Sequence, residues 1–284
     1  MKFKLKNIAI AIAATLALTS CSNDDDNSSN TNELTGLTKF QEITNDTHTI
    51  ELYSSKIGGL EQGYNDITVR LKNNASNQYI TNASISWTPK MHMMSMTHSC
   101  PNSSIIKNSN TETTYSGYIV FQMPENDTEY WDLTFNYIID GISYLATDVI
   151  SVPASEKRTI NTFTGTDGIK YIVAFVNPTE PKVAVNDFVA GIWKMENMMS
   201  FPVVDNYTLK IDPRMPSMGN HSSPNNLDAI QTTSGGLYNG KLSLTMTGYW
   251  KINLQLLNQD NEVLKGEEIS ETLESSSIYF EIEF

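Results

Sequence analysis

The sequence matches itself at a shift of about 120 residues, and this internal repeat limits the folds open to the chain. The matches keep the same order in both halves. In chain order, the matched pairs include Asn65 and Asn186, Met91 and Met215, His98 and His221, Tyr115 and Tyr238, Met123 and Met246, and Trp131 and Trp250. A repeat of this length corresponds to one small domain. We therefore predict two related modules: module 1, residues 38–155, and module 2, residues 156–284.

Each module carries the apolar alternation that is typical of β-strands. Ile67, Val69 and Leu71 alternate with polar residues, and residues 250–256 show the same pattern. Period-two spacing places such side chains on one face of a sheet. No stretch after the amino-terminal segment shows convincing helical periodicity.

Asp140-Gly141 lies between two apolar runs and predicts a two-residue β-hairpin. Together with the repeat, these patterns predict an all-β chain of two tandem immunoglobulin-like antiparallel β-sandwiches. We expect Trp131 and Trp250 to fill the cores of the two modules.

The amino terminus predicts export and lipidation. Residues 1–20 have three early lysines followed by an apolar stretch, as in a signal peptide, and Cys21 ends that stretch in a lipobox-like context. The Cys would become the first mature residue and anchor the protein to a membrane through lipid. The alternative is an ordinary secretory signal with an incidental Cys.

Residues 21–37 predict a flexible linker that follows the lipidated Cys, because they are rich in Asn, Ser and Thr. Residues 24–26 are three successive aspartates, which resemble the surface-export signal of Bacteroidota lipoproteins; the alternative is a solvated acidic tether. We expect an outer-membrane lipoprotein that is exposed at the surface or otherwise faces the periplasm.

Composition argues against two function classes. The formal net charge of −13 repels phosphate backbones, so nucleic acid is not an expected partner. The sequence has no nucleophile motif and no phosphate-binding loop, and its 4 histidines are too few for most general-base schemes. We therefore expect that the protein is not an enzyme.

Methionine and histidine gather in residues 91–100, and a matching segment follows in module 2. The candidate metal ligands are Met91, His92, Met93, Met94, Met96 and His98 in module 1, and Met215, Met218 and His221 in module 2. Alternation disfavours Met93 in any extended segment. Thioether sulfur is soft and binds Cu(I), whereas Mg²⁺ and Ca²⁺ prefer oxygen. The set predicts copper, Cu(I) in preference to Cu(II), and suits zinc less well.

The alternative to metal binding is packing, because methionine is a common core filler. Against it, Pro, Ser, Thr and Lys interrupt the run, and the two segments hold nearly all the histidine. Several further residues leave both interpretations open. Met195, Met198 and Met199 could contribute ligands but fit better as packing beside Trp193, Met123 and Met246 could close a site or face the core, and Cys100 could bind metal or be a buried apolar side chain.

At these residues the sequence resembles the YtkA-like family, which is related to FixH-type domains. Module 2 carries a Met-Pro-x-Met-x-x-His block at residues 215–221, a Gly-x-Tyr turn at 236–238 and a Met-x-Gly-x-Trp strand at 246–250. Module 1 keeps the methionines and the histidine but replaces Met-Pro with Met91-His92. The resemblance implies small extracytoplasmic immunoglobulin-like modules linked to copper handling, with module 1 as a diverged copy.

Two function hypotheses from different classes follow. The first is an envelope lipoprotein that binds copper through its Met/His clusters for storage, delivery or tolerance, with a copper-donating or copper-accepting envelope protein as its partner. The second is a metal-free adhesion or scaffold lipoprotein built from immunoglobulin-like modules.

Overall fold

Antiparallel strands make up nearly all the regular structure of residues 32–284, the part of the chain that the computed structural model describes. The helical structure in this part is one 3-10 turn, η1 (Pro216–Met218). The predicted all-β fold is confirmed. The predicted signal peptide, Cys21 and most of the linker lie outside the described residues.

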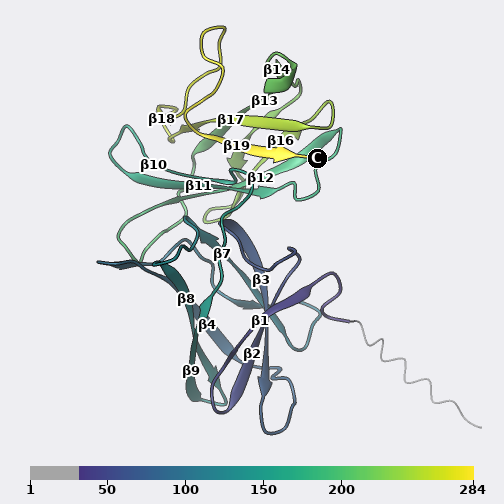
Figure 1. The fold of residues 1–284 in the computed structure, drawn as a ribbon, viewed down its shortest axis with the longest axis vertical. Helices are drawn as coiled ribbons and strands as arrows, with labels where there is room; N and C mark the ends of the chain where they lie inside the picture. The colour runs from purple at the N-terminus through teal and green to yellow at the C-terminus, as the bar shows by residue number, and fades with distance from the viewer. Residues whose placement is uncertain (1–31) are drawn as a thin grey trace, which may run out of the picture. The chain divides into compact units, whose positions relative to one another are not determined.

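Two sheets form module 1 (Figure 1). One has the strand order β1-β2-β3-β7-β6, and the other has the order β5-β4-β8-β9. The strands are β1 (Thr38–Thr44), β2 (His48–Ser54), β3 (Gly63–Asn73), β4 (Ser84–His92), β5 (Thr97–His98), β6 (Ile106–Lys107), β7 (Thr114–Phe121), β8 (Tyr130–Ile139) and β9 (Ile142–Ile150).

Module 2 repeats this topology within one continuous sheet. The order is β10-β11-β12-β16-β15-β13-β17-β18, with β14 paired to β13 and β19 paired to β17. The strands are β10 (Ile160–Thr164), β11 (Lys170–Asn177), β12 (Val185–Lys194), β13 (Thr208–Met215), β14 (His221–Ser222), β15 (Leu227–Gln231), β16 (Tyr238–Ser243), β17 (Tyr249–Leu257), β18 (Val263–Lys265) and β19 (Tyr279–Glu283). Strands β10-β11-β12-β16-β15 thus correspond to β1-β2-β3-β7-β6 of module 1.

Matched hydrogen bonds show that the repeat is structural. The indole N–H of Trp131 donates to the carbonyl oxygen of Met123 at 3.1 Å, and that of Trp250 donates to Met246 at 3.0 Å. The Asn65 amide nitrogen donates to the Gly63 carbonyl oxygen at 2.9 Å. The same bond joins Asn186 to the Ala184 carbonyl oxygen, also at 2.9 Å. Equivalent side chains thus close equivalent turns in both modules.

The expected alternation and the expected hairpin are both present. Ile67, Val69 and Leu71 are at most 1% exposed. Strands β8 and β9 meet at Asp140-Gly141, where both residues have positive φ, 49° and 80°. Two successive positive φ values suit the twist of a tight hairpin, and glycine adopts them without a Cβ clash.

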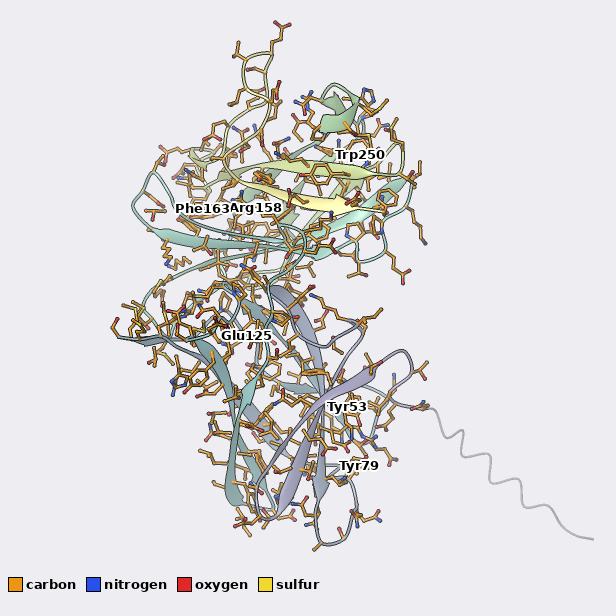
Figure 2. The ribbon with its side chains drawn as sticks, in the orientation of Figure 1. Tyr53, Tyr79, Glu125, Arg158, Phe163 and Trp250 are labelled. Atoms are coloured by element: carbon orange, nitrogen blue, oxygen red, sulfur yellow. The ribbon has the colours of Figure 1, made fainter. Side chains whose placement is uncertain are left out.

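Each module has its own apolar core. Trp131 and Trp250 are fully buried, one in each core, as predicted; the position of Trp250 can be followed in Figure 2. A third apolar group, the junction cluster, joins the two modules. It consists of Tyr64 and Val120 from module 1 and Ile160, Ile172, Ala174 and Trp193 from module 2.

Burial of His48 at the start of β2 couples the fold of module 1 to pH. Its side chain is 3% exposed and lies edge-on to the rings of Tyr137 and Tyr144. Burial lowers the pKa of His48, because the charged imidazolium loses its hydration. Below the ordinary histidine pKa of about 6.5, the unfolded chain therefore binds a proton that the folded module resists.

We expect the free energy of unfolding to fall as the pH drops from about 7 to 5, because the unfolded state binds more protons in that range. His48→Gln removes the titrating group and should flatten this dependence. Urea unfolding midpoints of both proteins across the range provide the measurement. Equal pH dependence in the two proteins would show that His48 is not responsible.

Candidate metal centre

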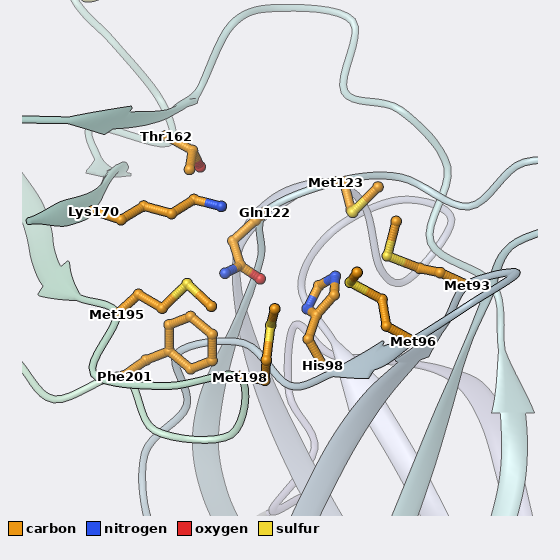
Figure 3. A pocket seen from close by; sticks show the side chains of 10 residues that line it. All are labelled: Met93, Met96, His98, Gln122, Met123, Thr162, Lys170, Met195, Met198 and Phe201. Atoms are coloured by element: carbon orange, nitrogen blue, oxygen red, sulfur yellow. The ribbon is translucent and has the colours of Figure 1, made fainter.

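A cavity of about 310 Å³ lies between the two modules, and we call it the methionine pocket (Figure 3). Module 1 lines it with Met93, Met96, His98, Gln122 and Met123, and module 2 lines it with Thr162, Lys170, Met195, Met198 and Phe201. The lining therefore holds five thioethers and one imidazole, and no carboxylate. This donor set is soft.

The β4–β5 hairpin brings three of these side chains to the pocket. Met91 pairs with His98 across the two strands, and the backbone N–H of Met93 donates to the carbonyl oxygen of Met96 at 3.0 Å. This bond closes a tight turn at residues 93–96. Met93 lies two residues after the inward-facing Met91 and is partly buried against the module 1 core, and its side chain lines the pocket.

The end of β7 supplies the next two lining residues. Gln122 and Met123 follow Phe121, the last residue of that strand. Their backbone carbonyl oxygens are held from two sides, because Gln62 donates its amide N–H to Gln122 at 3.1 Å and the Trp131 indole donates to Met123 at 3.1 Å. The strand end is therefore anchored to module 1 at two points.

Module 2 completes the pocket with the loop after β12. The backbone N–H of Met195 donates to the carbonyl oxygen of Lys170 at 2.8 Å. The carbonyl oxygen of Met198 accepts a hydrogen bond from the backbone N–H of Ser99 at 2.8 Å, so the loop is bonded directly to module 1. Figure 3 shows His98 between the module 1 methionines and those of this loop.

A hydrogen bond to the backbone orients the His98 ring and selects its tautomer. Its Nδ1 lies 2.7 Å from the backbone carbonyl oxygen of Ser99, and a carbonyl only accepts, so Nδ1 carries the proton. In the neutral tautomer that carries this proton, the free lone pair is on Nε2. Metal-binding histidines commonly donate their other N–H to a carbonyl or carboxylate in this way. The Trp131 ring meets the imidazole edge-on at 5.6 Å and limits its rotation.

Charge in the pocket opposes the binding of any cation, and it opposes divalent cations more strongly than monovalent ones. Lys170 is the one formally charged side chain among the lining residues, and it is positive. Coulomb repulsion scales with the charge of the ion, so Lys170 opposes a divalent ion twice as strongly as a monovalent one. No lining carboxylate compensates for it. Among residues 32–284, no group of three or more His, Cys, Asp or Glu side chains is placed to hold a metal ion.

Of the nine predicted ligands, Met93, Met96 and His98 line the pocket. The methionines Met91 and Met215 point inward and are 0% and 3% exposed, because each occupies a core position of its strand. The other predicted ligands of the two tips, Met94, Met218 and His221, are exposed and lie outside the lining. The structure thus brings together one part of the predicted set.

His92, the remaining predicted ligand, lies on another face. It follows the inward-facing Met91, so strand alternation turns its ring away from the core. There its Nε2 forms a close hydrogen bond with the Asp132 carboxylate, and its ring stacks on Tyr130 with centroids 4.8 Å apart. These contacts hold His92 apart from the methionine pocket.

Three methionines that the sequence left open between packing and ligation line the pocket. Met123 also packs against the module 1 core, and Met195 packs against the junction cluster that contains Trp193, so the packing expected for these two is present as well. The match between Met123 and Met246 marks the strand end. The methionine cluster at 195–199 marks the loop after β12 as a candidate in the sequence. No sequence signal identifies Gln122 or Lys170, because only tertiary packing brings them to the β4–β5 hairpin.

Comparison with known proteins adds no family assignment. The chain matches no protein-family model, and no curated protein matches it. The described residues contain no helix that is long and apolar enough to span a membrane. The resemblance to YtkA-like domains therefore stays a prediction.

Cys100 lies two residues after His98 but is not available as a ligand. Its side chain is 1% exposed within the module 1 core. Burial raises the pKa of its thiol well above the ordinary value, because a thiolate would lose its hydration. The packing interpretation of this residue is therefore the one that the geometry favours.

We expect native Cys100 to resist thiol reagents. In a protein of residues 32–284, which contains no other cysteine, a chromogenic disulfide reagent at mildly alkaline pH should release almost no thiolate from the folded state. The same protein in guanidinium chloride should react with one equivalent. Rapid reaction of the folded protein would show that Cys100 is accessible.

Proposed function

We propose that the protein binds copper at the cell envelope and holds Cu(I) in the methionine pocket. The observation that carries this proposal is the gathering of five methionines and one histidine from three separate chain segments around one cavity. Core packing needs no such selection of residue types, because leucine, isoleucine and phenylalanine fill space with better-defined rotamers.

The exposure of the pocket suits a site that takes up and releases metal. Met96 and Met198 line the cavity and are 47% and 44% exposed, so two of its sulfur donors are open to solvent. Thioethers do not titrate, and neutral ligands exchange more readily than thiolates. Metal can therefore pass to or from another envelope protein by stepwise ligand exchange, which serves storage, delivery or tolerance.

The cellular location of the protein is part of the same proposal. Residues 1–20 as a signal peptide and Cys21 as a lipidation site would place the protein in the outer membrane as a lipoprotein, surface-exposed or facing the periplasm. Thioether sites suit such a compartment because they do not form disulfides. The YtkA-like motifs of module 2 point in the same direction.

Leucine substitution tests the pocket. In residues 32–284 under anaerobic conditions, M96L/M123L/M198L should weaken Cu(I) binding by about tenfold or more, since each change removes a sulfur donor while keeping the side-chain volume. The matched control is M94L/M199L/M218L, which changes three exposed methionines outside the lining. Competition with a coloured Cu(I) chelator measures both affinities.

Equal affinities of the two triple variants would reject the pocket as the site. No Cu(I) uptake by the wild-type protein would reject copper binding altogether and leave the adhesion or scaffold hypothesis.

Lys170 provides a test of charge selectivity. K170L should raise the affinity for Cu(I) by about threefold and that for Cu(II) or Zn²⁺ by about tenfold, because the repulsion that it removes doubles with ionic charge. K210L alters an exposed lysine outside the lining and keeps the same net charge as K170L. Parallel competition titrations measure the affinities, and equal gains for both charge states would contradict the electrostatic argument.

A further inference from the structure

The most unusual polar atom of the methionine pocket is the side-chain oxygen of Gln122. This Oε1 is buried and accepts no hydrogen bond from any described residue. Buried polar atoms of native proteins nearly always have a partner, so an exception needs an explanation, such as a bound water or ion. Gln122 lines the same cavity as the soft donors.

The Oε1 atom of Gln122 faces the imidazole and thioether side chains of the pocket (Figure 3). Figure 3 shows the Gln122 amide between Lys170 and His98, with its oxygen turned toward His98 and Met198. The Gln62 side chain holds the backbone of Gln122 through a 3.1 Å hydrogen bond, and the adjacent Met123 backbone is held by Trp131. The side chain therefore extends into the cavity from a fixed position.

We propose that Oε1 of Gln122 is a metal ligand that completes the thioether and imidazole set of the pocket. The inference rests on the proposed function and assigns a ligand to the same site. An amide oxygen is neutral, so it adds a donor without the negative charge that would favour divalent ions. Amide oxygen is a known weak ligand in sites whose main donors are sulfur and imidazole nitrogen.

If Oε1 of Gln122 is a ligand, it lowers the stability of the metal-free protein and raises the affinity for metal. Both effects can be measured. An unpartnered buried acceptor is destabilising until the metal binds it. Q122L replaces the amide with an apolar side chain and removes the donor. Q122M keeps the unbranched shape of the side chain and supplies a soft donor at nearly the same reach.

The experiment uses residues 32–284 as wild type, Q122L and Q122M. We expect Q122L to raise the Tm of the metal-free protein by about 2–4 °C and to weaken Cu(I) binding by about tenfold. Q122M should retain at least wild-type affinity. In X-ray absorption spectra of the Cu(I) forms, Q122L should lose one oxygen or nitrogen scatterer, and Q122M should gain one sulfur.

Each other outcome overturns the inference. If Gln122 only shapes the cavity, Q122L and Q122M will bind Cu(I) equally well. Their X-ray absorption spectra will then show the same number of oxygen or nitrogen scatterers as the wild-type protein. Q122L affinity within twofold of wild type also rejects the ligand. Failure of wild type to bind Cu(I) rejects the proposed function itself, so the two failures are distinguishable.

Discussion

Burial of Trp193 between the two modules is the interaction on which the candidate site depends. Its side chain is 1% exposed and meets the Tyr118 ring of module 1 at 5.9 Å between centroids. An indole buried in this way contributes more apolar area than any other side chain in the junction cluster. Trp193 also lies two residues before Met195, so the same packing sets where the loop after β12 meets module 1.

Packing at the junction holds the pocket-lining residues of the two modules close together in the metal-free protein. The apolar packing of the junction cluster and the hydrogen bond from Ser99 to Met198 act on the same loop. Ligands held by packing and hydrogen bonds lose less conformational entropy when they bind an ion. Long thioether side chains would keep enough rotamer freedom to adjust around the proposed ion.

The two copies of the repeat differ where the modules meet. His98 and His221 hold equivalent positions opposite Met91 and Met215. His98 is half-buried against Trp131 and the module 2 loop, whereas His221 is exposed. The same strand pairing therefore gives two environments, because module 2 covers the tip of module 1 and the tip of module 2 is open to solvent.

Local patterning in the sequence was enough to predict the β-architecture. Alternation in β3 and β17 determines which side chains are buried, since a one-residue change of register would turn every apolar side chain to solvent. Asp140-Gly141 fixes the β8–β9 hairpin because few other pairs accept positive φ at both positions. The residue types of the segment 91–98 likewise predicted soft-metal chemistry.

Tertiary structure alone decided which donors meet. Strand alternation places Met91 and Met93 on the core side of β4 and His92 on the other face. Only the packing of module 2 against the β4–β5 hairpin makes Met93, Met96 and His98 the wall of a cavity. Gln122, Met195 and Met198 join the site through contacts between modules, which local sequence does not encode. The physical reason is that periodicity specifies the face of a strand, whereas the distance between segments depends on how two finished cores pack together.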